Sequence, residues 1–133
     1  MSVRVSASGR SFPKSERLLK HADFQRVYQA GRRQFTGNMT VFFLRREADD
    51  APQPGPRIGL TVGKALGGAV ERNRIKRRMR EAVRLAMPPI AARLDIVINP
   101  RKSVLTLAFP ELQNEVARCL RVAEQRARVA GEK

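Results

Sequence analysis

A basic segment near the middle of the chain constrains the fold more than any other stretch. Residues 64–84 read KALGGAVERNRIKRRMREAVR, and their spacing predicts one amphipathic helix with an apolar arc and a cationic arc. The apolar arc consists of Ile75, Met79, Ala82, Val83 and Ala86. The cationic arc consists of Asn73, Lys76, Arg77, Arg80 and Arg84. One arc requires a hydrophobic core, and the other requires water or a negatively charged partner.

The charge of this segment favours a partner over water. Seven cations and one carboxylate, Glu81, lie between Arg72 and Arg84. Neighbouring cations on a helix repel one another, and structural helices with a solvated face usually interleave Glu with Lys. Six of the seven cations are arginine, whose planar guanidinium suits bidentate phosphate contacts. The segment therefore predicts a polyanionic partner.

The composition of the whole chain agrees with this prediction. The 133 residues are enough for one domain, and 27 Lys and Arg against 12 Asp and Glu give a net charge of +15, which attracts nucleic acid. No stretch approaches the roughly 20 apolar residues of a spanning helix, and the first ten residues lack the apolar core of a signal peptide. Cys119 is the single cysteine, so no intramolecular disulfide can form. We therefore expect a cytoplasmic protein with no membrane partner.

The first half of the chain predicts one helix followed by strands. Residues 21–30 place Phe24, Val27 and Tyr28 on one helical stripe, and Gly31 is a candidate left-handed cap. Such a stripe is usually core. Extended structure is expected over 32–46 with a break at Gly37-Asn38, and again over 57–64.

The second of these strands has one face with almost no side-chain volume, formed by Gly59, Thr61 and Gly63. This face has room for a ligand, or equally for a close contact with another part of the backbone.

The second half predicts a short strand over 94–98 and a final helix from about Pro110. The buried side of this helix is expected to contain Leu112, Val116, Cys119, Leu120, Ala123 and Ala127. Residues 47–56 can only be a loop, because they contain three prolines.

The order of elements predicts an α+β sandwich: a mixed sheet with helices mainly on one face, and the basic helix as a crossover. We expect a flexible basic arm over 1–11, one nucleic-acid-binding domain over 12–123, which the resemblance described below makes an RNA-binding domain, and a frayed tail over 124–133.

The residues of catalysis are poorly represented. The single histidine, His21, is expected to be solvated or to cap a helix, and the closest carboxylates, Asp49-Asp50, lie in the proline-rich loop. No Cys/His group has the spacing of a metal site, and the glycines at 63–68 lack the spacing of a nucleotide-binding phosphate loop. We therefore expect no catalytic residues, no metal site, no cofactor and no small-molecule substrate in the protein itself.

Several stretches together resemble the protein subunit of bacterial ribonuclease P. The signature match comprises Val62-Gly63-Lys64, residues 67–78 and Arg80-Glu81, with Arg72-Asn73-Arg74 at its centre. Supporting matches are Phe12-Pro13, Arg17-Leu18-Leu19, Asp23-Phe24, Val27-Tyr28, Arg57-Ile58-Gly59-Leu60 and the final helix. The chain departs from the family pattern at Ala65, where a second lysine is usual, at Gly68, and over residues 34–38.

The resemblance implies a fold and a division of labour. The fold is α-β-β-β-α-β-α, a two-layer sandwich of the ribosomal S5 domain 2-like type with a left-handed crossover. The function is that of an accessory subunit of an endoribonuclease: one copy of the protein binds ribonuclease P RNA and the 5′ leader of precursor tRNA. The RNA, with Mg²⁺, removes the leader to make the mature 5′ end of the tRNA.

The resemblance also implies which residues bind RNA. The residues for the catalytic RNA are Lys64, Arg72, Asn73, Arg74, Lys76, Arg77 and Arg80. Those for a leader-binding cleft are Phe24, Tyr28, Thr40, Phe42 and Thr61, with Phe12, Arg17 and Arg57 as additional candidates. Aromatic side chains suit this role because single strands are held by base stacking and a basic track.

Other function classes remain open at this point. A ribosomal or ribosome-assembly protein without a role in cleavage would share the same charge pattern. A helix-turn-helix DNA regulator is less favoured, because strands flank the basic helix where a partner helix would be expected. A self-sufficient metal nuclease is the enzyme alternative, and it would need clustered carboxylates.

Overall fold

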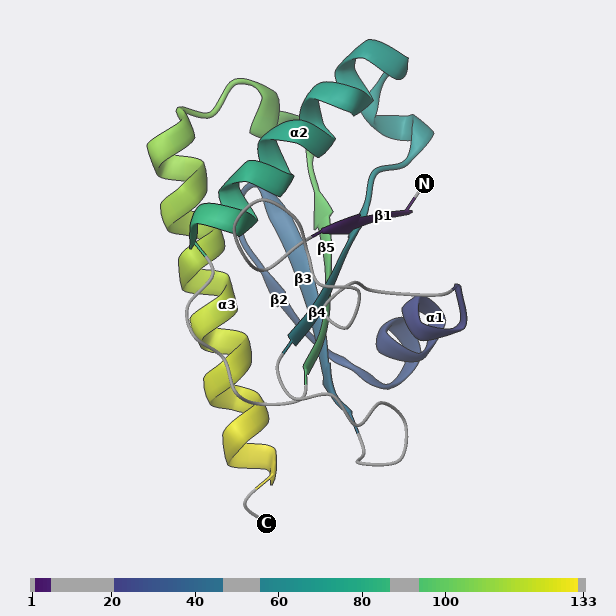
Figure 1. The fold of residues 1–133 in the computed structure, drawn as a ribbon, viewed down its shortest axis with the longest axis vertical. Helices are drawn as coiled ribbons and strands as arrows, with labels where there is room; N and C mark the ends of the chain where they lie inside the picture. Colours follow the sequence, from purple (N-terminus) through teal and green to yellow (C-terminus); the bar gives the residue numbers. More distant parts are fainter. Residues whose placement is uncertain (1, 6–20, 47–55, 87–93, 132–133) are drawn as a thin grey trace.

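The protein, described here as a computed structural model, is an α+β fold in which a mixed sheet lies between helices (Figure 1). The structure describes residues 2–5, 21–46, 56–86 and 94–131. The helices are α1 (His21–Ala30), α2 (Ala69–Ala86) and α3 (Phe109–Gly131), with short 3₁₀ turns η2 (Lys64–Leu66) and η3 (Lys102–Leu105). The strands are β1 (Ser2–Val5), β2 (Arg32–Phe35), β3 (Met39–Arg45), β4 (Pro56–Thr61) and β5 (Leu94–Pro100).

The five strands form one sheet in the order β1-β4-β5-β3-β2. The pairs β1/β4, β2/β3 and β3/β5 are antiparallel, whereas β4 and β5 are parallel. Helix α2 connects the two parallel strands, so the basic helix is the expected crossover. From α1 onward the element order is the α-β-β-β-α-β-α order of the resemblance, which is confirmed; the left-handed sense of the crossover stays a prediction.

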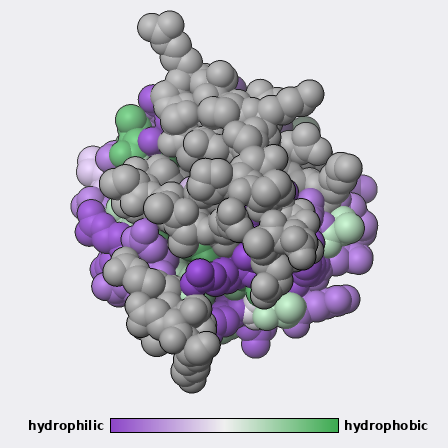
Figure 2. Space-filling model, turned by 60° about the horizontal axis from the view of Figure 1, so that its bottom comes forward, coloured by the Kyte–Doolittle hydropathy of each residue, from purple (hydrophilic) through white to green (hydrophobic). Residues whose placement is uncertain are grey.

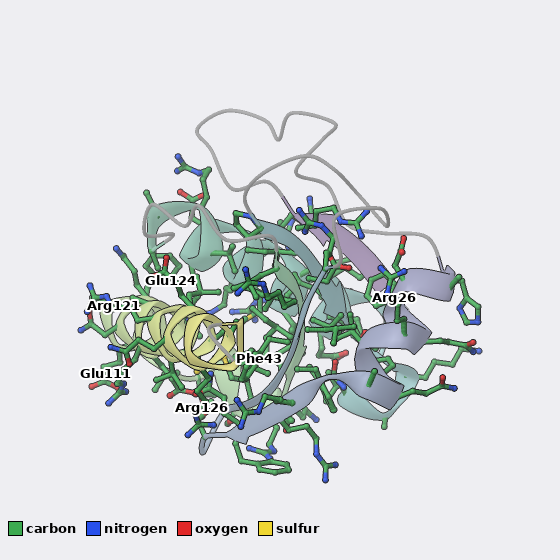
Figure 3. The ribbon with its side chains drawn as sticks, turned by 90° about the horizontal axis from the view of Figure 1, so that it is seen from below. Arg26, Phe43, Glu111, Arg121, Glu124 and Arg126 are labelled. Atoms are coloured by element: carbon green, nitrogen blue, oxygen red, sulfur yellow. The ribbon has the colours of Figure 1, made fainter. Side chains whose placement is uncertain are left out.

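The two faces of the sheet have different helical cover. Helices α2 and α3 cover one face and bury the main core, which includes Phe43, Ile96 and Leu120. Helix α1 covers part of the opposite face through a small core of Phe24, Val27 and Val97. Figure 3 shows this arrangement from below, with α3 and α1 on opposite sides of the strands. The helices are therefore mainly on one face, as expected, and the α1 side is covered by a single short helix.

Both ends of the chain differ from the expectation of flexible tails. Residues 2–5, expected to be part of a flexible arm, form strand β1 at the edge of the sheet, with Val3 paired to Leu60. The edge of β4 has unpaired backbone groups that a strand can satisfy. At the other end, α3 continues as far as Gly131, and Ala127 is buried in the main core. The buried stripe of α3 thus extends into the segment that was expected to fray.

Two glycines fix the ends of helices, in ways that the sequence alone did not predict. Gly31 does not have a positive φ, so the expected left-handed cap is wrong. A Cβ at Gly31 would lie 2.4 Å from the carbonyl oxygen of Val27 and 2.8 Å from that of Phe43, so close backbone approach requires glycine there. Gly67 has φ of 130°, which separates η2 from α2 and makes the basic segment a turn plus a helix.

Of the loop expected over 47–56, residues 47–55 lie outside the described ranges, whereas Pro56 begins β4. The matches at Phe12-Pro13 and Arg17-Leu18-Leu19 also lie outside the described ranges. Among the described residues, no helix combines the length and the apolar character needed to cross a membrane.

Candidate nucleic-acid interface

Helix α2 exposes a row of arginines on the side away from the core. Ile75, Met79, Ala82 and Val83 are fully buried, which confirms the apolar arc. The exposed residues opposite them are Asn73, Arg74, Arg77 and Arg80, which we call the arginine face of α2. Lys64, in η2 before the helix, is exposed as well. Among the described residues no ion pair involves any of these cations, so their charge is available to an external anion.

Two other cations assigned to RNA by the resemblance lie elsewhere on the helix. Lys76 is only 8% exposed, so its place on the cationic arc is wrong. It lies seven residues before the buried Val83 and therefore on the same helical stripe, which accounts for its burial. Arg72 is half-buried seven residues before Met79, and its Nε has no hydrogen-bond partner among the described residues. Fewer of the residues that the resemblance assigns to RNA are therefore exposed than the sequence suggested.

Two further arginines of α2 have hydrogen-bond partners within the protein. Arg78 donates from Nε to the carbonyl oxygen of Val104 at 2.9 Å and from its terminal nitrogen to that of Leu107, so it fixes the turn before α3. Arg84 donates to both carboxylate oxygens of Glu81, one turn earlier. This hydrogen bond, assisted by the charge of Arg84, lowers the pKa of Glu81 below its ordinary value. Neither guanidinium is as available as those of the arginine face.

A second surface lies on the α1 side of the sheet, where Tyr28 leans over the strands. The Tyr28 hydroxyl lies 2.6 Å from Thr61 Oγ1 and donates to Asn99 Oδ1 at 3.1 Å. Its ring contacts that of Phe42 edge to face, with centroids 4.8 Å apart. Thr40 is the residue paired with Asn99 in the β3/β5 ladder. We call Tyr28, Thr40, Phe42, Thr61 and Asn99 the aromatic surface; all five side chains are partly exposed.

The structure brings four of the five expected cleft residues together and places the fifth, Phe24, in a core. Phe24 is only 5% exposed, because its ring packs with Val27 and Val97 under α1. It belongs to the small core and is not available to a base. The predicted open face near Gly63 is supported, since a Cβ there would meet no atom within 4 Å.

Asn99 and Arg101 are functional candidates that the sequence analysis missed. The strand was expected over 94–98, whereas β5 continues to Pro100 and pairs Asn99 with Thr40. The Tyr28 hydroxyl contacts the side chains of both Asn99 and Thr61. Arg101 follows the strand and donates to the backbone oxygen of Thr36 and, at 3.4 Å, to the hydroxyl of Thr40. The alternation Asp95, Val97, Asn99 was the signal that could have identified this face.

A group of ion pairs surrounds Asp95, whose side chain is fully buried. Its Oδ1 accepts from Arg46 at 2.9 Å and from Arg57 at 2.8 Å, and its Oδ2 accepts from Arg57 at 2.8 Å and from Arg26 at 3.0 Å. Asp23 adds a pair with Arg26 at 3.0 Å. We call Asp23, Arg26, Arg46, Arg57 and Asp95 the Asp95 cluster. Arg57, an additional RNA-binding candidate, thus holds the fold; the other two, Phe12 and Arg17, lie outside the described residues.

The remaining chemically notable side chains have structural surroundings. His21 is exposed and its Nε2 lies 3.0 Å from the side-chain nitrogen of Gln25. Cys119 is 2% exposed, and burial raises the pKa of its thiol to about 11, so the predicted core role is confirmed. Within the described ranges, no group of three or more His, Cys, Asp or Glu side chains is placed to hold a metal ion.

The described surface is mostly hydrophilic where Figure 2 shows it, and the hydrophobic residues visible there are scattered. Together with the net charge of +15, this character suits a polyanion better than an apolar protein partner.

Comparisons with known proteins agree over most of the chain. The family model described as Ribonuclease P matches residues 12–124. A ribonuclease P protein component from Desulforapulum autotrophicum is 43% identical over 108 residues, which cover 81% of this chain and 88% of that protein. A ribonuclease P protein component from an Exiguobacterium species is 41% identical over 116 residues, which cover 87% of this chain and 93% of that protein. The solved RNase P protein of Staphylococcus aureus matches with a TM-score of 0.66 at 31% identity, covering 80% of this chain and 94% of that chain. The solved RNase P protein of Thermotoga maritima matches with a TM-score of 0.66 at 25% identity, and the match covers 77% of this chain and 93% of that chain.

Proposed function

The chain belongs to the family of ribonuclease P protein components, and on that premise we propose that its two exposed surfaces bind two different RNAs. The arginine face of α2 binds the catalytic RNA of the ribonucleoprotein. The aromatic surface on the α1 side binds the single-stranded 5′ leader of precursor tRNA. The protein thereby assists removal of the leader.

One observation supports the first half of the proposal more than any other. Arg74, Arg77 and Arg80 repeat every three residues on the exposed side of a helix whose opposite side is fixed in the core. A rigid helix presents these guanidinium groups in a fixed row, and their planar forks suit phosphate oxygens. Phosphate contacts of this kind fix the position of an RNA without reading its sequence.

The second half rests on the chemistry of the aromatic surface. Tyr28 and Phe42 present partly exposed rings from two different elements, and polar side chains of Thr61 and Asn99 lie beside them. Aromatic stacking holds a base of any sequence, and the hydroxyl and amide groups add hydrogen bonds to sugar or base edges. An unpaired strand is the form of RNA whose bases are free to stack in this way.

We assign the cleavage chemistry to the RNA partner and to Mg²⁺ bound by that RNA. The protein then holds substrate and catalyst together, which raises the fraction of precursor tRNA bound in a reactive position. One copy of the protein per catalytic RNA is sufficient for this role, since each surface is complete within one chain.

Reconstituted cleavage tests the proposal. Adding the protein to its catalytic RNA at low Mg²⁺ should restore removal of the leader from precursor tRNA. The double variant Arg74→Ala/Arg77→Ala should weaken assembly with the catalytic RNA by about tenfold or more, because hydrogen bonds between charged groups are lost.

The matched control is Arg118→Ala/Arg121→Ala, which removes the same charge at the same spacing from the exposed side of α3. Figure 3 shows Arg121 on α3, away from α1. An equal loss of affinity for the catalytic RNA in the two double variants would contradict a specific role for α2. Intact RNA binding without any restored cleavage would favour a ribosomal or ribosome-assembly protein instead.

A further inference from the structure

Phe35 has an exposed ring at the edge of the sheet that the two surfaces do not include. Among the described residues, the exposed large hydrophobic side chains are Phe35, Val70 and Leu85, and Phe35, at 64% exposed, is the aromatic one. Single exposed apolar residues are common on protein surfaces, so exposure alone carries no function. Its position and its neighbours provide the argument.

The strand register places Phe35 in line with the aromatic surface. Phe35 pairs with Thr40 across β2/β3, and Thr40 pairs with Asn99 across β3/β5. The parallel β4/β5 ladder ends at the pair Leu60 and Ile98, so Thr61 and Asn99 are the next residues along the two strands, and the Tyr28 hydroxyl contacts both of their side chains. Since paired residues project to the same face of a sheet, these four side chains form one row across four strands, spanning about 14 Å. Phe35 is the outer end of a row whose inner part we have assigned to single-stranded RNA.

Basic side chains lie near Phe35, at the outer end of this row. The guanidinium carbon of Arg33 lies over the Phe35 ring, 5.4 Å from its centroid. Arg33 pairs with Phe42, so it projects from the same face as the aromatic surface. Arg101 lies beside Thr40 and is exposed. A ring with adjacent cations is the combination that binds single-stranded nucleic acid, because the ring stacks on a base while the cations contact its phosphates.

The edge position of β2 gives a competing interpretation, in which a strand from another protein pairs with it. Two of its four residues, Arg32 and Arg33, are exposed arginines, and charges on an edge strand disfavour such pairing. The net charge of +15 also favours RNA over a protein strand.

We propose that Phe35 is an additional stacking site for one further base of the 5′ leader, with Arg33 and Arg101 contacting the adjoining phosphates. The leader then crosses the sheet from Thr61 on β4 to Phe35 on β2. This inference rests on the proposed leader-binding function of the aromatic surface and extends the length of leader that the protein contacts.

A fluorescence experiment tests the stacking directly, because the chain contains no tryptophan. The variant Phe35→Trp, assembled with the catalytic RNA, provides a single indole at this site. Precursor tRNA with a long leader should quench the indole emission, whereas tRNA without a leader should not. Equal emission with both RNAs would overturn the proposal, as would quenching by the catalytic RNA alone with no further change on adding the leader.

A series of leaders lengthened one nucleotide at a time gives the independent measurement. Above a threshold length, Phe35→Ala should lower the affinity for precursor tRNA by about fivefold or more, and below that length it should have no effect. Phe35→Leu keeps an apolar side chain without a ring, so it should lower the affinity for precursor tRNA as much as Phe35→Ala does. Full affinity of Phe35→Leu at every length would overturn stacking. Because the ring is exposed, these substitutions should leave the fold intact, and thermal denaturation checks this.

Phe42→Ala separates this inference from the proposed function. If Phe42→Ala lowers leader affinity and Phe35→Ala does not at any length, the Phe35 site is wrong and the aromatic surface stands. If neither substitution changes leader affinity, the proposed leader-binding function fails together with the inference that rests on it.

Discussion

The Asp95 cluster and the arginine face of α2 contain the same kind of residue in opposite circumstances. In the first, Arg26, Arg46 and Arg57 converge on one buried carboxylate. In the second, Arg74, Arg77 and Arg80 are exposed, and no ion pair of the described residues includes them. The difference shows that arginine content alone does not identify an RNA-binding surface.

The physical reason for the difference is the cost of an unpaired charge. A buried carboxylate such as Asp95 is tolerated only when hydrogen-bond donors surround it. Arginines from α1, from β4 and from the end of β3 supply these donors. The chain has 12 acidic residues and 27 Lys and Arg, so many cations have no internal counter-charge to recruit. Those on an exposed helix face are the ones that remain for an external polyanion.

The largest expected effect is the loss of the carboxylate at the centre of the cluster. Asp95→Asn leaves three arginines close together, one of which, Arg46, has a fully buried side chain. We expect a loss of about 3–5 kcal/mol in the free energy of unfolding, measured by urea denaturation. Asp23→Asn, at the exposed rim of the cluster, should cost less. A wild-type unfolding midpoint for Asp95→Asn would show that the cluster does not hold the fold.

The arginine face should show its role in salt dependence and leave stability unchanged. With four exposed cations, Lys64, Arg74, Arg77 and Arg80, the logarithm of the affinity for catalytic RNA should fall against the logarithm of salt with a slope of about −3. Arg74→Ala/Arg77→Ala should reduce the magnitude of that slope by about 1.4. Titrations at several salt concentrations measure it, with Arg118→Ala/Arg121→Ala as the control. Identical slopes for all three proteins would remove the distinction between the two sets of arginines.

Adjacent residues of α2 give a finer test of the same distinction. Lys76→Met keeps the buried stem and removes the charge, so RNA affinity should stay within about twofold of the wild type. Arg77→Met, one residue later and exposed, should lower the affinity by about tenfold. Equilibrium binding of the two single variants to the catalytic RNA measures the difference. A larger loss for Lys76→Met would place Lys76 at the interface despite its burial.

The smallest expected effect concerns the pair between Glu81 and Arg84. The hydrogen bond from Arg84 lowers the pKa of Glu81, so the paired carboxylate is favoured in the folded state. Its contribution is present above the ordinary pKa of glutamate and is lost as the pH falls through the lowered value. NMR titration of the Glu81 carboxyl should show a higher midpoint in Arg84→Ala than in the wild type. An unchanged midpoint would mean that the pair does not form in solution.

Much of the fold followed from local patterns. The helix over 21–30, the break at Gly37-Asn38 and the strands on either side of the basic helix all lie where hydrophobic periodicity and turn residues placed them. Strand β1 did not follow, because its pairing with β4 is a long-range contact, and the four residues Ser-Val-Arg-Val are too short a pattern to predict it. The role of Gly31 was missed for the same reason, since the crowding carbonyl of Phe43 comes from another strand.

The candidate site was predicted in outline and corrected in detail. Tyr28, Phe42 and Thr61 come together as the resemblance implied, although they lie far apart in the sequence. The resemblance also assigned Phe24 to this site, but its ring packs in the small core, whereas Tyr28, one turn later on the same helical stripe, is partly exposed. Only strand register shows that Asn99 lies on this surface and that Phe35, the proposed additional stacking site, is in line with it.

The sequence by itself determined that this protein has a cationic helix with one apolar side, a surplus of positive charge, and a family signature around Arg72-Asn73-Arg74. These properties are local, because they depend on residue type and on spacing along one element. Only the tertiary structure decided which arginines are free, since that depends on whether a carboxylate from a distant strand reaches them. It likewise decided which aromatic rings are open to solvent, since burial is set by what packs across the sheet.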